Sequence, residues 1–108
     1  MSGYRVQYSA EAVEDIRNIH RYIADELRAP QAARKQVDRI RKMIRSLNDS
    51  PFRFTALEWE PWASMGMRRV SVDRYLVFYL VQNAESTVTV IRIFYSGRNI
   101  EEIVRDDT

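Results

Sequence analysis

The sequence contains no cysteine, a single histidine and only three glycines. Without cysteine there is neither a disulfide framework nor a thiolate metal site. His20 has no second histidine or cysteine with which to share a metal ion. The glycines, Gly3, Gly66 and Gly97, lie too far apart for a glycine-rich phosphate loop. We therefore predict a protein with no metal site and no cofactor.

Long apolar runs are also absent. No stretch approaches the ~18 residues needed to span a membrane, and the N-terminal MSGYRVQYS lacks the apolar region of a signal peptide. A chain of 108 residues forms one domain, 1–108, which buries roughly 65% of its unfolded surface. We expect a cytoplasmic protein that makes no membrane contact.

Charge is nearly balanced overall, with 17 basic and 15 acidic residues, but it is unevenly distributed. The segment 34–45 is strongly basic, with Asp38 as its one acidic residue. This face of a predicted helix is either ordinary solvated surface or a binding surface for RNA, DNA or an acidic partner. Its six cations are Arg34, Lys35, Arg39, Arg41, Lys42 and Arg45.

The segment from Gly66 to Arg98 predicts a three-stranded antiparallel meander. Arg74 to Gln82 contains YLVFYLV, which is apolar or aromatic at every position, as in a central strand covered on both faces. Val88 to Tyr95 and Met67 to Val72 are the flanking strands, joined through turns at 83–86 and at Asp73.

The N-terminal half predicts a strand and two helices. Tyr4 to Tyr8 alternates apolar and polar residues, and Ser9 is a good helix N-cap. Helix one is expected from Ala10 to Leu27, and helix two from Pro30 to Leu47. We predict that both pack on one sheet face. The predicted contact set is Val13, Ile16, Ile23, Val37, Ile40 and Ile44 on the helices and Leu76, Phe78, Ile91 and Ile93 on the sheet.

Two further segments complete the predicted α+β fold. Residues 52–65 contain Phe52, Phe54, Trp59 and Trp62, which predicts an ordered loop held by its aromatic rings rather than a free linker. Asn99 to Val104 predicts a short C-terminal helix. The expected order is an N-terminal strand, a helical hairpin, an antiparallel meander and this final helix.

The order and spacing of several motifs resemble the RelE/ParE superfamily of type II toxin–antitoxin toxins. The motifs are YSAEAVEDIRNIHRYI, RSLNDSP, MGMRRVSVDRYLVFYLV and VTVIRIFYSGRNIEEI. The ParE-like, plasmid-stabilisation branch is the most similar. The resemblance implies a growth-inhibiting toxin silenced by a cognate antitoxin. It also implies one of two targets, DNA gyrase for ParE-like members or ribosome-bound mRNA for RelE-like members.

The residues can be compared with a metal-free ribonuclease of the RelE type. Such an enzyme needs a base, an acid and cations that stabilise the phosphorane. Where the family has a strand arginine and a histidine, this chain has Tyr75 and Tyr95. Tyr95 can serve as an acid but is a poor base. With Arg98 and Arg68, it forms the candidate catalytic set, which leaves the enzymatic assignment open.

Each of these residues also has a structural interpretation. Arg68, Arg69 and Arg98 can form surface ion pairs, and the two tyrosines can pack on the sheet. Arg92, inside an apolar strand, either faces solvent or pairs with a carboxylate such as Glu58 or Glu60, and we favour the pair. Candidate RNA-binding or partner-binding residues are Arg34, Lys35, Arg41, Lys42, Arg69 and Arg92.

For the antitoxin, we predict a partly apolar groove between the helical hairpin and the sheet, bordered by the cations of helix two. Such a groove suits an amphipathic helix with an acidic face. A non-toxic module that keeps the fold and only binds a protein or nucleic acid is the alternative hypothesis, because the usual histidine and strand arginine are missing.

Overall fold

The computed structural model describes residues 3–97, 100 and 103. A five-stranded sheet has the order β1-β5-β4-β3-β2, with β1 (Arg5–Tyr8) parallel to β5 (Thr87–Tyr95). The other neighbours are antiparallel, namely β4 (Tyr75–Gln82), β3 (Arg68–Val72) and the two-residue β2 (Thr55–Ala56). The predicted meander and its central strand are thereby confirmed.

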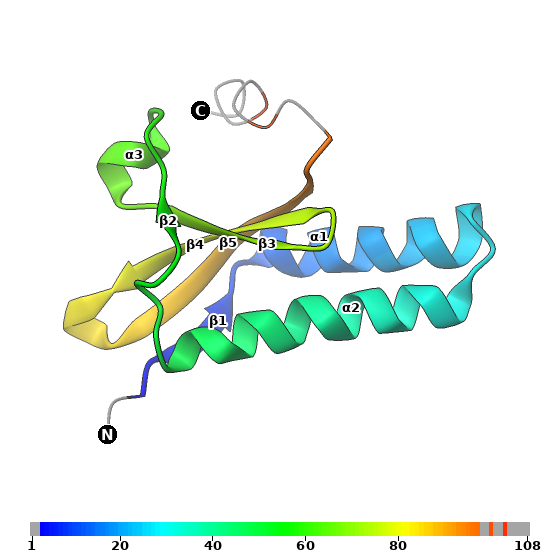
Figure 1. Cartoon of the computed structure of the whole chain (residues 1–108), viewed down its shortest axis with the longest axis horizontal. Coiled ribbons are helices and arrows are strands. Elements are labelled where there is room, and N and C mark those ends of the chain that lie inside the picture. Colours follow the sequence, from blue (N-terminus) through cyan, green and yellow to red (C-terminus); the bar gives the residue numbers. More distant parts are fainter. Residues whose placement is uncertain (1–2, 98–99, 101–102, 104–108) are drawn as a thin grey trace.

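The helical hairpin lies on one side of this sheet, and its far end projects beyond the strands (Figure 1). α1 (Ala10–Arg21) is followed by a π-helical turn at Tyr22–Glu26, and α2 (Pro30–Arg45) by a 3₁₀ turn at Ser46–Asn48. The Ser9 hydroxyl caps α1 by accepting from the amide of Ala12, and Pro30 stands at the first turn of α2. Both predicted helix starts are confirmed, whereas the first helix widens into a π turn where a continuous α-helix was expected.

Two apolar clusters cover the two faces of the sheet. Under the hairpin the cluster is mostly aliphatic and includes Ile16, Val37, Ile40 and Ile44, as predicted. Val13, in contrast, is 38% exposed, and Ala12 takes the buried position instead. Val13 and Ile23 lie on the flanks of the helix stripe, outside this cluster, so their predicted packing on the sheet is wrong.

The facing of the strands also differs from the prediction. Val77 and Tyr79 point toward the helices, whereas Leu76, Phe78 and Ile91 join the opposite cluster. A β-bulge explains the case of Ile91: Phe78 pairs with Arg92 but Tyr79 pairs with Val90, which leaves Ile91 as an extra residue. Ile93 therefore returns to the helix side, as predicted. Because β4 is apolar at nearly every position, its sequence does not alternate and could not predict which side chains point toward the helices.

The opposite cluster is aromatic and confirms the ordered loop. Trp59 stacks on Trp62 at 5.6 Å, and Trp62 meets Phe78 at 5.0 Å between ring centroids. The short helix α3 (Trp62–Met65) ends at Gly66, whose φ of +80° favours glycine. Ile100 and Ile103 are helical and pack against this cluster, as expected of the C-terminal helix. The rest of that predicted helix lies outside the described residues.

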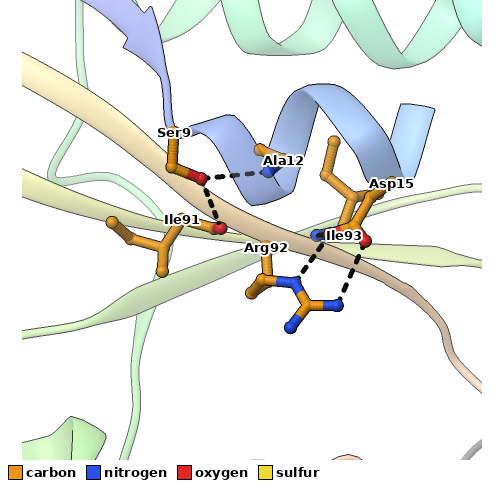
Figure 2. Close-up of polar contacts among 6 residues, drawn as sticks. All are labelled: Ser9, Ala12, Asp15, Ile91, Arg92 and Ile93. Atoms are coloured by element: carbon orange, nitrogen blue, oxygen red, sulfur yellow. Dashed lines mark hydrogen bonds and ion pairs between the residues drawn. The ribbon is translucent and has the colours of Figure 1, made fainter. Parts of the chain in front are cut away.

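Beyond the end of β1, side chains of α1 take over the hydrogen bonds along the edge of β5 (Figure 2). The Ser9 hydroxyl donates to the Ile91 carbonyl at 2.7 Å, and the Asp15 carboxylate accepts from the Ile93 amide at 2.9 Å. Arg92 binds the same carboxylate through Nε and Nη2, at 2.9 and 3.1 Å. This fixes α1 against β5 where strand pairing stops.

Candidate functional site

Arg68 and Tyr95, the two candidate catalytic residues that the structure describes, are not brought together. Arg68 lies opposite Tyr79, in the middle of β4, whereas Tyr95 lies opposite Tyr75, the first residue of that strand. Four residues of strand separate these levels, about 13 Å. Arg98 lies outside the described residues. Arg68 and Tyr95 are therefore too far apart to act on one phosphate group without a large rearrangement.

Arg68 has a structural role in its present position. Its Nη1 donates to the carbonyl of Phe54 at 2.7 Å and to that of Phe52 at 3.3 Å. Its guanidinium also lies 5.1 Å from the centroid of the Phe52 ring. These contacts fasten the 52–54 loop to the edge of the sheet. Exposed Arg69, its neighbour on β3, alternates to the other face.

Arg92 pairs with a carboxylate, as favoured, but the partner is Asp15 instead of Glu58 or Glu60. The Arg92 side chain is 26% exposed and that of Asp15 only 11%. Its guanidinium also lies 4.4 Å from the centroid of the Phe94 ring. These contacts give Arg92 a structural role, and its use as an RNA-binding or partner-binding residue stays an untested prediction.

A cleft of about 900 Å³ opens between the projecting end of the hairpin and the β3–β4 turn; we call it the inner cleft. Its walls carry three large exposed apolar side chains, Tyr22, Leu27 and Tyr95, which are 55%, 55% and 42% exposed. Ile19 and Ile23 continue the apolar surface toward the sheet. Exposed apolar side chains gathered in one concavity are typical of a protein-binding surface.

Three tyrosines contribute to the inner cleft. The rings of Tyr75 and Tyr95 meet edge to face at 5.8 Å between centroids. Burial raises the pKa of the Tyr75 hydroxyl, and the neighbouring Tyr95 and Tyr22 raise it further. The Tyr75 hydroxyl is therefore neutral near pH 7 and can serve as a hydrogen-bond donor or acceptor.

Charges at the rim of the inner cleft are mostly paired. Arg39 of α2 holds Asp73 through two hydrogen bonds of 2.7 and 2.8 Å, and Gln36 adds a third. These bonds lower the pKa of the Asp73 carboxyl, the hydrogen bonds from Arg39 being the largest cause. The backbone of Asp73 is left-handed, with φ +57°, which confirms the predicted turn. Arg74 adds a cation to this rim.

The predicted basic border of this cleft is wrong for most of α2. Arg34, Arg41 and Arg45 instead line the opposite flank of the hairpin, the side where α1 and α2 meet away from the inner cleft. Lys35 and Lys42 are exposed and line neither surface. At 100° per residue, the six cations of one helix are distributed over three directions around its axis.

The flank with the arginines contains two adjoining cavities. The smaller, of about 410 Å³, is the arginine groove; it is lined by Tyr8, Val13, Ile16, Arg17, Arg41 and Arg45. The larger, of about 590 Å³, shares Ile16, Arg17 and Arg41 with it. The larger cavity also contains Arg21 and Arg34, together with the carboxylates of Asp25 and Asp38.

Two further expectations can be compared with the described part of the chain. Within residues 3–97, 100 and 103, no three histidine, aspartate or glutamate side chains gather as a metal site would require. His20 lines the larger arginine-side cavity. No helix in the same residues has the length and apolar character needed to cross a bilayer.

Sequence reasoning missed several residues of these surfaces. The sequence assigns no role to Tyr22 or Asp15, and Leu27 is expected only as the last residue of helix one. The one local signal for the inner cleft is Tyr22 itself, an aromatic residue that lies beside the apolar stripe of helix one. Asp15 gives no local signal, because its partner Arg92 lies 77 residues away.

Comparisons with known proteins agree with this geometry. The family model for the ParE toxin of the parDE type II toxin–antitoxin system matches residues 6–100. A chain of the chromosomal ParDE system from P. aeruginosa is similar in structure, with a TM-score of 0.70 and 18% identity over 85% of this chain and 95% of that chain.

RelE-type structures are similar as well. The RelBE2 toxin–antitoxin complex of Mycobacterium tuberculosis gives a TM-score of 0.64 at 18% identity, covering 88% of this chain and 93% of that one. The archaeal RelE–RelB complex of Pyrococcus horikoshii OT3 gives 0.60 at 18%, covering 89% and 98%. No curated protein matches the sequence. Since the family model covers most of the chain, the protein belongs to the ParE toxin family of type II toxin–antitoxin systems.

Proposed function

We propose that this protein arrests growth by binding a macromolecular target in the cytoplasm and that a cognate antitoxin neutralises it. The observation that supports an antitoxin partner is the inner cleft. It presents Tyr22, Leu27 and Tyr95 as exposed apolar side chains in a concavity large enough for one face of an amphipathic helix. Similar folds occur in the RelBE2 toxin–antitoxin complex and in the archaeal RelE–RelB complex.

We expect the antitoxin segment to present an apolar face to the inner cleft. Only Arg74 supplies a cation that is not committed to an ion pair in the described chain, so the contact depends on burial of apolar surface more than on charge. A segment that orders as it binds needs a large interface, well above ~1,200 Å² in total.

For the target, we favour DNA gyrase over ribosome-bound mRNA. The ParE resemblance implies gyrase, and the separation of Arg68 from Tyr95 argues against a ribonuclease site built from the predicted set. The second candidate function is a non-toxic binding module. It is supported by the same separation of Arg68 from Tyr95, together with an inner cleft suited to binding a protein.

Inducible expression with and without the neighbouring open reading frame tests the proposal. Expression of this chain alone should stop growth, and co-expression should restore it. In vitro, the purified chain should inhibit supercoiling by gyrase, while primer extension on cellular mRNA shows no new ends. New mRNA ends would indicate the ribonuclease, and unimpaired growth with a stable complex would indicate the non-toxic module.

A variant of the cleft makes the test specific. Tyr22→Ala with Leu27→Ala removes two exposed side chains, so it should leave the fold intact and weaken antitoxin binding at least tenfold. Met65→Ala is the matched control, because Met65 is 54% exposed on α3, outside the cleft. Equal binding by both variants would show that the antitoxin does not use the inner cleft.

A further inference from the structure

The arginine groove concentrates positive charge on the flank of the hairpin away from the inner cleft. Arg17 comes from α1 and Arg41 and Arg45 from α2, so the two helices provide cations from both sides. No carboxylate is among the described residues that line this groove. Three like charges around one open cavity attract an anion.

These cations are largely uncommitted. Arg41 and Arg45 form no hydrogen bond or ion pair with the part of the chain that the structure describes. Arg17 has one contact, a 3.6 Å approach to Glu14 between side chains that are 67% and 54% exposed. An ion pair that long and that exposed is weak, so Arg17 can turn to an external anion at little cost.

The floor of the groove limits the kind of ligand. Ile16 is only 4% exposed, and Val13, at 38%, is the one apolar side chain of the floor that is open to solvent. An amphipathic helix would gain little apolar burial here, in contrast to the inner cleft. Tyr8, half-buried against the aliphatic cluster, adds an aromatic ring to the lining. The charges of Arg41 and Arg45 lower the pKa of its hydroxyl against the larger raising effect of burial.

From this combination, we infer that the arginine groove binds the phosphodiester backbone of a single-stranded nucleic acid. The three guanidinium groups bind successive phosphates, and Tyr8 offers a ring on which a base can stack. The adjoining cavity shares Arg17 and Arg41, and the charges of its other arginines, Arg21 and Arg34, are offset by Asp25 and Asp38. The inference stands on this groove alone and holds whether or not the chain arrests growth.

Fluorescence anisotropy with labelled ten-nucleotide oligo-dT and oligo-U tests it on the purified full chain. With three phosphate contacts, the logarithm of the affinity should fall with the logarithm of the salt concentration with a slope of about −2. Between 50 and 200 mM salt the affinity should then drop about 20-fold.

A charge-matched pair of variants separates the groove from general positive charge. Arg41→Ala with Arg45→Ala should reduce the slope to about −0.7, so that the same salt change weakens binding only about threefold. Lys35→Ala with Lys42→Ala removes the same charge from the same helix, but these side chains do not line the arginine groove, so it should keep the parent slope. Arg41→Lys with Arg45→Lys should also keep the parent slope, because the positive charges remain. Thermal melts followed by circular dichroism verify that each variant is folded.

Several outcomes would overturn the inference. Equal loss in the arginine and lysine variants would mean diffuse attraction with no site. Tighter binding of a duplex of the same length would exclude a single-strand groove. Binding of a glutamate-rich peptide at low salt, with no binding of either oligonucleotide, would assign the surface to an acidic protein.

Discussion

The two flanks of the helical hairpin are made from the same two helices but have different chemistry. The inner cleft is apolar, contains three tyrosines and has most of its charges paired. The arginine groove has a small apolar floor, two cations without partners in the described chain, Arg41 and Arg45, and a third, Arg17, that is only weakly paired with Glu14. The difference indicates that one hairpin can present two binding surfaces with different ligands, one for burial of apolar surface and one for charge.

The largest expected effect comes from the core that supports both flanks. Ile40 is fully buried between α2 and the sheet, so Ile40→Ala should lower the free energy of unfolding by about 2–5 kcal/mol. Both antitoxin and oligonucleotide binding should weaken together. Urea denaturation measures the stability, and a variant as stable as the parent would contradict the observed packing of α2.

Replacing Asp15 should lower the stability of the contact between α1 and β5 without affecting the arginine groove. Asp15→Ala leaves the Arg92 guanidinium and the Ile93 amide without their acceptor, which should cost about 3 kcal/mol. Glu14→Ala, the exposed neighbour, is the control and should cost less than ~0.5 kcal/mol. In both folded variants, the slope of the logarithm of oligonucleotide affinity against the logarithm of salt concentration should be unchanged. If the two substitutions cost the same, the Asp15–Arg92 contact does not fix α1 to β5.

The Arg39–Asp73 pair gives a pH-dependent signature of the inner rim. The pKa of Asp73 is lowered in the folded chain, so the pair stabilises the fold above the ordinary aspartate pKa and the contribution is lost as pH falls through the folded value. NMR titration should find the Asp73 carboxyl below its usual range. In Arg39→Ala it should return toward that range, and an unchanged titration would show that Arg39 is not the cause.

The smallest effect is expected in the arginine groove. Because Arg41 and Arg45 have no partner to lose in the described chain, replacing both by alanine should leave the melting temperature almost unchanged. The pKa of Tyr8 should rise, since the two charges that oppose the effect of burial are gone. A spectrophotometric titration against a Tyr8→Phe reference measures this. A marked loss of stability would show that these arginines are structural.

The sequence by itself was sufficient for the local elements and the family. Ser9 and Pro30 marked the two helix starts, and the period of Val37, Ile40 and Ile44 identified the buried stripe of α2. The apolar run at 75–81 identified the central strand. These features depend on backbone propensity and on periodicity within a few residues of chain, which a single sequence records directly.

Only the tertiary structure decided how those elements face one another and what their charges do. The bulge at Ile91 reversed the facing within β5, and no alternation existed in β4 to indicate its inward side. Asp15 meets Arg92, and Arg39 meets Asp73, across 77 and 34 residues of chain. Arg68 and Tyr95 match one family pattern but lie on β3 and β5, opposite residues of β4 that are four positions apart. Such relations depend on strand register and on helix rotation over the sheet, which arise only when distant segments pack.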